Sequence, residues 1–213
     1  MLNNKVKIMP KDNKEQDILR AAEKMFVLKG FKGATTNLIA AEAGVTHAML
    51  HYYFRTKDQI FLKVLDSYVG QMRSELKALM EEDVYDIDVI GRVTEVMFDF
   101  FNSHRRHVAL FLEVAADRPD LLDSYVSDFG RFIGTAFTAH GERTRRAVEK
   151  GQIRDISFLS LFADIVTVCS STLLFEPVLD NLFKLDPKAK ESFLADRRRE
   201  AVILITDRLK ITD

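Results

Sequence analysis

Residues Thr35–Lys57, TTNLIAAEAGVTHAMLHYYFRTK, have the pattern of two short helices joined by a turn, and they constrain the fold more than any other segment. Thr36 is a candidate N-cap of the first helix, because its hydroxyl can accept from a backbone N–H of the first turn. Gly44 stands where the chain must turn, and glycine tolerates a positive φ. Thr46 offers a cap for the second helix. The segment therefore predicts a helix-turn-helix.

The second short helix has two distinct faces. Leu50 and Phe54 are four residues apart, so they share a face that we expect to point inward. The outer surface is left to His47, Ala48, Met49, His51 and Tyr52, with Tyr53 at the border. No acidic residue occurs from Thr46 to Lys57, and acidic groups would repel phosphate, so this surface suits nucleic acid. The alternative is a partner-facing or half-buried helix of an ordinary bundle.

Flanking segments supply the supporting helices. An apolar stripe at helical spacing predicts a helix from Asp12 or Asn13 to Gly30. In the first short helix, we expect Leu38, Ile39 and Ala43 to share the inward face. Thr56 and Gln59 have the spacing of a capping box, which predicts a further helix to about Met80.

Charge divides the chain into two parts. Residues 1–57 carry ten basic and five acidic side chains, a surplus of five positive charges, whereas the whole chain is −1 and the remainder is therefore −6. A basic end on an acidic body suits a protein that offers phosphate one face. Lys5, Lys7 and Lys11 are expected to form an arm that touches the DNA backbone or minor groove.

Composition favours an all-α fold. Glycine (9) and proline (4) are sparse, and no strand-like alternation persists. The single cysteine, Cys169, excludes an intrachain disulfide, suits a reducing cytoplasm and is expected to be a small core residue. The longest apolar stretch, 156–175, is interrupted by Asp164 and several Ser/Thr, and the N-terminus lacks an apolar signal core. We therefore expect a cytoplasmic protein with no membrane span.

Five further helices are expected in the larger C-terminal part, at 89–101, 108–115, 119–150, 157–183 and 187–210. Phenylalanine is abundant, with 16 residues. A Phe-rich interior is either a packed core or an apolar cavity that admits a small molecule. The candidate lining residues of such an effector pocket are Met97, Phe101, His104, Phe111, Phe132 and Phe162.

The last two helices are candidates for self-association. Leu161, Ile165, Val168 and Thr172 form one possible seam, and Ala201, Leu204 and Ile205, with Phe193 and Leu209, form the other. Two such helices from each of two subunits would make a four-helix bundle. The alternative is packing within one monomer. The run 197–199, three arginines, is expected to be a solvated or ion-paired face.

Catalytic and cofactor motifs are missing from the sequence: no P-loop, no dinucleotide glycine fingerprint and no GxSxG occurs. His104 and His107 could share a helix face with Glu113 further on, but Arg105 and Arg106 between the histidines oppose a bound cation. We therefore expect no enzyme, no metal and no cofactor.

The stretch AAEKMFVLKGFKGATTNLIAAEAGVTHAMLHYYFRTKDQI resembles the N-terminal domain of TetR-like transcriptional regulators, and the match covers about Ile18 to Leu65. Several spaced elements carry it: the AA…F…GF segment, the TT…IA..AGV segment and the aromatic-F-x-x-K ending. The resemblance implies an all-α homodimer with a three-helix DNA-binding head, residues 1–56. It also implies a larger helical body, residues 57–213, that binds an effector and dimerises.

The resemblance also assigns roles by position. Thr36 and Lys57 would contact phosphate, Thr46 would cap the reading helix and touch phosphate, and Asn37 is a further candidate for the groove. The reading surface would be His47, Ala48 and Met49 over base edges, with His51, Tyr52 and Tyr53 over bases and backbone. The family usually has Tyr at His51, often Gly at Ala48, and frequently Thr or Ala at Met49. These departures bear on the operator sequence more than on DNA binding.

The function that follows is a ligand-responsive transcriptional regulator. We expect a repressor, bound as a homodimer to double-stranded palindromic DNA and released by a small apolar effector. The helix that starts at residue 57 would link head and body. Two alternatives stay open: a helical interaction protein that does not bind DNA, and a DNA-binding regulator that has lost ligand control.

Overall fold

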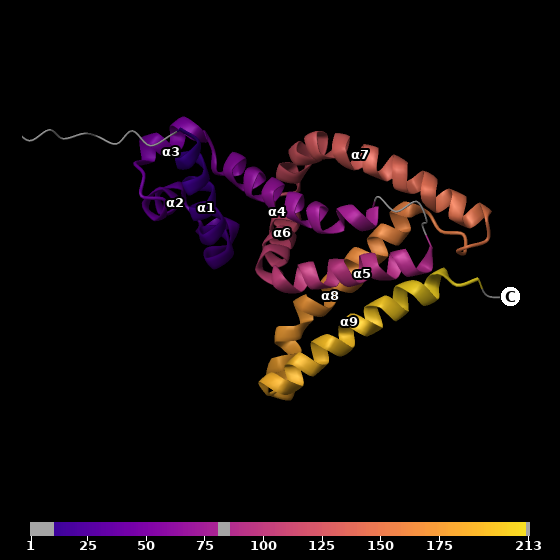
Figure 1. The fold of residues 1–213 in the computed structure, drawn as a ribbon. Helices are drawn as coiled ribbons and strands as arrows, with labels where there is room; N and C mark the ends of the chain where they lie inside the picture. The colour runs from indigo at the N-terminus through magenta and orange to yellow at the C-terminus, as the bar shows by residue number, and fades with distance from the viewer. Residues whose placement is uncertain (1–10, 81–85, 212–213) are drawn as a thin grey trace, which may run out of the picture. The chain divides into compact units, whose positions relative to one another are not determined.

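The chain is all-α in the computed structural model, as the composition predicts. The structure describes the backbone of residues 11–80 and 86–211; the side chains of 11–13, 80 and 124–137 lie outside the described part. The helices in these ranges are α1 (Lys11–Gly33), α2 (Thr36–Glu42), α3 (His47–Tyr53), α4 (Lys57–Met80), α5 (Ile87–Ser103), α6 (Arg105–Asp117), α7 (Pro119–Glu149), α8 (Phe158–Phe183) and α9 (Pro187–Leu209) (Figure 1). Of the predicted arm, Lys5, Lys7 and the side chain of Lys11 lie outside the described residues.

Two compact units divide these helices. The head unit comprises the chain up to Val69 together with Leu110–Leu121, and the body unit comprises Gly70–Ala109 and Leu122–Asp213. The domain boundary predicted between residues 56 and 57 coincides with the start of α4. The head unit extends beyond that boundary, because it takes in the whole first half of α4, to Val69, and the segment Leu110–Leu121 around the junction of α6 and α7.

The head unit is built on a small apolar core. Ile18, Ala22 and Phe26 of α1, Ile39 of α2 and Leu50 of α3 are all fully buried. Phe26 packs edge-on against Phe61 of α4, with ring centroids 5.5 Å apart. This core holds α2 and α3 at a fixed angle over α1.

The sequence predicts that α1 ends at Gly30, but the helix kinks there and continues to Gly33. Gly30 has φ 70° and ψ 171°, a region open essentially to glycine alone. A Cβ at this position would also lie 3.0 Å from a carboxylate oxygen of Glu113. The kink therefore lies against Glu113 of α6, within the head unit.

We expect Gly30→Ala to destabilise the chain by about 2–3 kcal/mol, because it adds a side-chain clash to a backbone strain of about 1–3 kcal/mol. Gly44→Ala is the matched control, since Gly44 also has positive φ (63°) but nothing within 4 Å of its missing Cβ. Denaturant titration should show the smaller loss for Gly44→Ala. Adding Glu113→Ala should recover part of the Gly30→Ala loss; no recovery would mean that Glu113 does not crowd Gly30.

The body unit is a helical bundle in which α5 packs against both α8 and α9 (Figure 1). α5 buries a broad face that includes Val89, Ile90, Met97 and Phe100. Ion pairs reinforce the packing: Arg198 of α9 donates to both carboxylate oxygens of Asp99, at 2.8 and 2.9 Å. The arginine run 197–199 is thus ion-paired, as predicted, with Glu200, Asp99 and Asp196 as partners.

α8 is the one helix in the described ranges that is long and apolar enough to cross a membrane by length and composition alone. Core helices of soluble proteins pass the same test. In the body unit α8 buries Leu161, Ile165, Cys169 and Leu173 against the bundle and keeps its opposite side exposed. Cys169 is a core residue, as predicted, and burial raises the pKa of its thiol to about 12, which leaves it unreactive at neutral pH.

Candidate nucleic-acid interface

The turn between α2 and α3 is set by two threonine caps and one glycine. Thr35 accepts from the backbone N–H of Leu38 at 3.3 Å, and Thr46 accepts from that of Met49 at 3.1 Å. The sequence predicts Thr36 as the first cap, but the cap is Thr35, because the helix already begins at Thr36. Gly44 has φ 63°, so the glycine turn and the Thr46 cap are confirmed.

Only part of the predicted inward face of α2 is buried. Ile39 and Ala40 face the core, whereas Leu38 is 39% exposed and Ala43 is half-buried. The prediction was wrong for Leu38 and Ala43 because this seven-residue helix is wedged between α1 and α3 and buries only a narrow edge.

α3 has the two faces that the sequence predicts. Leu50 is fully buried and Phe54, just after the helix, is 4% exposed. The outer side chains are all exposed: His47, Ala48, Met49, His51 and Tyr52, with Tyr53 half-buried. Their exposure within the head is confirmed, while their contact with DNA stays a prediction.

Rings and hydroxyls crowd this outer surface. The Nε2 atom of His47 lies 3.0 Å from Oγ1 of Thr36, which joins the start of α2 to the start of α3. The rings of His47 and His51 meet edge-on at 4.3 Å, and those of Tyr52 and Tyr53 at 5.4 Å. We define the reading surface as Thr36, Asn37, Thr46, His47, Ala48, Met49, His51, Tyr52 and Tyr53. It offers aromatic area and hydrogen-bonding tips without an acidic residue.

The nearest acid on α2 is already paired. Glu42 forms an ion pair with Lys24 of α1, with the Nζ and Oε1 atoms 2.5 Å apart. The predicted capping box at the start of α4 is present in part: Thr56 accepts from the N–H of Gln59 at 3.1 Å, but Gln59 accepts from the N–H of Arg55, one residue before the cap, at 3.0 Å. These two bonds restrain the loop from α3 to α4, in which Arg55 is exposed.

Lys57 makes its contacts inside the head, and its contact with phosphate stays a prediction. Its ammonium donates to the carbonyl oxygen of Phe31 at 2.8 Å and lies 4.3 Å from the centre of the Phe31 ring. Burial lowers the pKa of Lys57, and Arg118 nearby lowers it further, while Asp58 and Glu113 oppose the shift. The ammonium predicted to meet phosphate is thus engaged inside the head.

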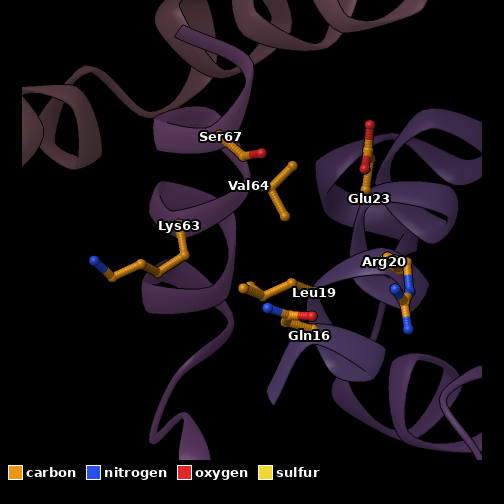
Figure 2. Close-up of a pocket in the computed structure, with 7 residues that line it drawn as sticks. All are labelled: Gln16, Leu19, Arg20, Glu23, Lys63, Val64 and Ser67. Atoms are coloured by element: carbon orange, nitrogen blue, oxygen red, sulfur yellow. The ribbon is translucent and has the colours of Figure 1, made fainter. Parts of the chain in front are cut away.

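Two shallow hollows lie on the head. One, of about 270 Å³, lies between α1 and α4, and Leu19, Arg20, Glu23, Lys63 and Val64 are among the residues that line it (Figure 2). The other, of about 420 Å³, lies between α1 and α2. Both are open and charged, and neither includes a residue of the predicted effector pocket.

The predicted pocket residues are not drawn together as one lining. Met97 and Phe101 are buried in the body core, and His104 stacks on Phe100 with its Nδ1 atom 2.9 Å from the Phe100 carbonyl oxygen. Phe111 belongs to the head unit and is exposed, which corrects its placement in the body's interior. Phe162 is half-buried in α8, and the side chain of Phe132 lies outside the described residues.

Metal binding gains no support from the histidine pair. The rings of His104 and His107 are 5.6 Å apart. Within the described ranges no cluster of three or more His, Cys, Asp or Glu residues could hold a metal ion.

The predicted dimer seam needs correction. Six of its nine residues are buried inside the body unit of a single chain: Leu161, Ile165, Thr172, Ala201, Ile205 and Leu209. A side chain buried in its own chain cannot face a second copy, so the prediction is wrong for these six. Leu204 is 52% exposed, and Val168 and Phe193 are half-buried, so these three remain available.

Sequence reasoning missed an exposed apolar face on the second half of α8. Its members are large side chains at helical spacing, which we name the α8 stripe: Leu174, Phe175, Val178 and Leu182. Their exposed fractions run from 38% to 69%. The spacing was visible in the sequence, but the choice of buried face in an almost wholly apolar helix was not.

The junction of α6 and α7 was missed as well. Arg118 pairs with Asp58 of α4 at 3.0 Å, and Asp117 pairs with Lys32 of α1 at 2.7 Å. No local pattern could reveal these contacts, because their partners are about sixty residues or more away in the sequence.

Comparison with known proteins agrees with this geometry. Residues 18–64 match the family model described as "Bacterial regulatory proteins, tetR family". The HTH-type transcriptional regulator RutR of Escherichia coli (strain K12) is 30% identical over 121 residues, which cover 56% of this chain and 57% of RutR. The first curated relatives are matched over about half of their length or less.

Solved structures extend the likeness of fold to nearly the whole chain. The TetR family transcriptional regulator PfmR from Thermus thermophilus has a TM-score of 0.62 at 17% identity, covering 91% of this chain and 99% of PfmR. The transcriptional regulator FadR from Bacillus subtilis, solved with stearoyl-CoA, has a TM-score of 0.65 at 14% identity, covering 92% and 99%. Residues 18–64 therefore resemble the TetR family by sequence, and nearly the whole chain has the fold of the solved regulators.

Proposed function

We propose that this chain binds double-stranded DNA through the reading surface and regulates transcription. The observation that carries the proposal is α3, whose outer face is exposed, aromatic and free of acidic residues while its inner face is locked by Leu50. A helix of this kind enters the major groove with its first residues over base edges. Ala48 and Met49 are short or flexible enough for close approach, and Met49 suits a thymine methyl group.

We further propose that the protein acts as a homodimer on a palindrome. The α8 stripe and the exposed Leu204 supply the support, because an exposed apolar face of this kind is typical of a subunit interface. Two copies related by a two-fold axis would present two copies of α3 to half-sites about one helical turn apart.

A small effector would control the binding. The related fold of FadR was solved with stearoyl-CoA, and the apolar acyl chain of a ligand of that kind would suit a Phe-rich body. We propose that the effector binds the body, favours a conformation with wrongly spaced heads and so releases a repressor from its operator. Such a switch requires different affinities for the two conformations. The coupling would pass through α4, which runs from the head unit into the body unit.

The test is a mobility-shift titration on DNA upstream of the protein's own gene at about 50 mM and 200 mM salt. A dimer that makes six or more phosphate contacts should lose affinity by roughly a thousandfold over this range. If the protein bound scrambled DNA with the same affinity, the binding would be non-specific and the proposed sequence recognition would be wrong. An affinity that ignores salt would contradict the proposed reading surface.

A second arm adds stearoyl-CoA to the preformed complex. Release of DNA, with stabilisation of the free protein in a thermal shift, is expected if the effector is an acyl-CoA. If stearoyl-CoA stabilised the protein but did not release the DNA, it would be a ligand of the protein, and the proposed release of the repressor by this ligand would be wrong.

A further inference from the structure

Within the head unit, the junction of α6 and α7 contacts the start of α4, the helix that follows α3. Arg118 stands between the two helices and extends its guanidinium to Asp58, the second residue of α4, with Nη2 3.0 Å from Oδ2. The same guanidinium is held by Asp120 through Nε at 2.9 Å and Nη2 at 2.8 Å. Asp120 thus orients Arg118, and Arg118 holds the start of α4.

A second set of contacts fixes the end of α1 to the same junction. Lys32 pairs with Asp117 at 2.7 Å. Glu113 lies against Gly30, where glycine leaves room for the carboxylate. The junction therefore contacts the end of α1 and the start of α4 together.

Phe31 connects these two contacts. Its carbonyl oxygen accepts from Lys57 at 2.8 Å, and its ring has Lys57 at 4.3 Å and Arg118 at 6.0 Å from the centroid. The ring also packs against Phe26 and Phe61 in the head core, with centroid distances of 5.8 and 5.1 Å. A shift of Arg118 would therefore displace Phe31, which binds Lys57 in the first turn of α4.

The start of α4 determines where α3 ends. Only three residues, 54–56, separate Tyr53 from Lys57, and each is restrained. Phe54 is buried, Arg55 is bonded to Gln59, and Thr56 caps α4. With no slack in this connection, the position of the first turn of α4 fixes the angle at which α3 leaves the core.

We propose that Arg118 is a positioning residue for DNA recognition, which acts through Asp58 on the start of α4 and so on the pose of α3. The inference rests on the proposed function. We name the contacts of Arg118 with Asp58 and of Lys57 with Phe31 the clasp. In this account Lys57 binds Phe31 instead of contacting phosphate. Arg118 does not touch DNA in this account.

The decisive variant is Asp58→Asn in the full chain. If electrostatics alone mattered, removal of an acid next to the reading surface would raise DNA affinity. The clasp predicts the opposite sign, a loss of about tenfold, because α3 would be misplaced; this loss equals about 1.4 kcal/mol of binding free energy. Asp66→Asn is the matched control, because Asp66 lies on α4, is exposed and pairs only with Lys63 at 3.5 Å among the ion pairs described. It should leave affinity unchanged or slightly raised.

Arg118→Met tests the partner. We expect a similar loss of about tenfold, and the double variant Asp58→Asn/Arg118→Met should be no weaker than either single variant, because each acts through the other. Arg118→Lys should retain most of the affinity, since it keeps the charge. The slope of log affinity against log salt should stay at the wild-type value in all of them.

Three outcomes would overturn the inference. A salt slope lower by about 0.9 in Arg118→Met would make Arg118 a phosphate ligand. An additive double variant would mean that the two residues act independently. A gain of affinity in Asp58→Asn would leave the proposed function intact and remove the clasp, whereas a wild-type chain that binds no DNA would remove the proposed function and the clasp with it.

Discussion

We expect Ala48→Glu to reduce operator affinity by about a hundredfold or more while the head stays folded. Ala48 is exposed on α3, and glutamate is a good helix former, so the substitution asks nothing of the core. The new carboxylate would lie among phosphates and base edges, where one unfavourable contact costs about 1–3 kcal/mol. A symmetric dimer brings the variant side chain to both half-sites, so this cost is counted twice.

The control for Ala48→Glu is Gln152→Glu, which adds the same charge at an exposed turn after α7. Fluorescence anisotropy with labelled operator DNA gives both affinities, and circular dichroism gives the melting temperatures. Equal melting temperatures with affinity lost only in Ala48→Glu would support the reading surface. Unchanged affinity in Ala48→Glu would mean that DNA, if bound, is held by another face.

The reading surface could be predicted because its information is local. Gly44, the Thr46 cap and the Leu50–Phe54 spacing fix a turn, a start and a buried face within a short stretch of sequence. Each of these requirements is met by backbone geometry that a short window of sequence determines. The error of one residue at the first cap, where Thr36 was predicted and Thr35 is observed, arose because both are threonines.

The tertiary contacts of the same head could not be predicted. Lys57 has the position of a phosphate ligand in the resemblance, but a carbonyl oxygen 26 residues earlier holds its ammonium. Arg118 would pass for a solvated arginine at a helix junction. Both roles depend on partners that the fold, and not the local pattern, brings near.

The dimer seam failed for a different reason. α8 is apolar on nearly every side, so its spacing cannot tell which side meets α5 and α9 of the same chain. The structure buries the side of Leu161 and Ile165 and leaves the α8 stripe open. Only the packed bundle distinguishes the two faces.

We expect Phe175→Glu to convert the protein from dimer to monomer with the fold intact. Phe175 is 63% exposed within one chain, and its removal leaves no cavity in the core. In a two-fold seam the new carboxylate would be buried twice, and the desolvation of each unpaired charge costs several kcal/mol. Two such penalties should outweigh the stabilisation of the dimer, so light scattering should report half the wild-type mass, with an unchanged helical signal.

Ile165→Glu separates this seam from the one that the sequence predicts. Ile165 is 6% exposed, so a carboxylate there would be buried within the chain and should unfold it instead of yielding folded monomers. Gln152→Glu serves again as the charge control and should remain dimeric. A dimeric Phe175→Glu would place the subunit interface away from the α8 stripe.

The monomer matters for function because the two heads act together only when the seam joins them. Once the α8 stripe is broken, each head would bind its half-site alone, and the affinity gained from linking two sites, about a hundredfold or more, would be lost. Phe175→Glu should therefore weaken binding to the full palindrome while leaving binding to an isolated half-site unchanged. Ala48→Glu should weaken both, and this difference distinguishes a broken seam from a broken reading surface by DNA binding alone.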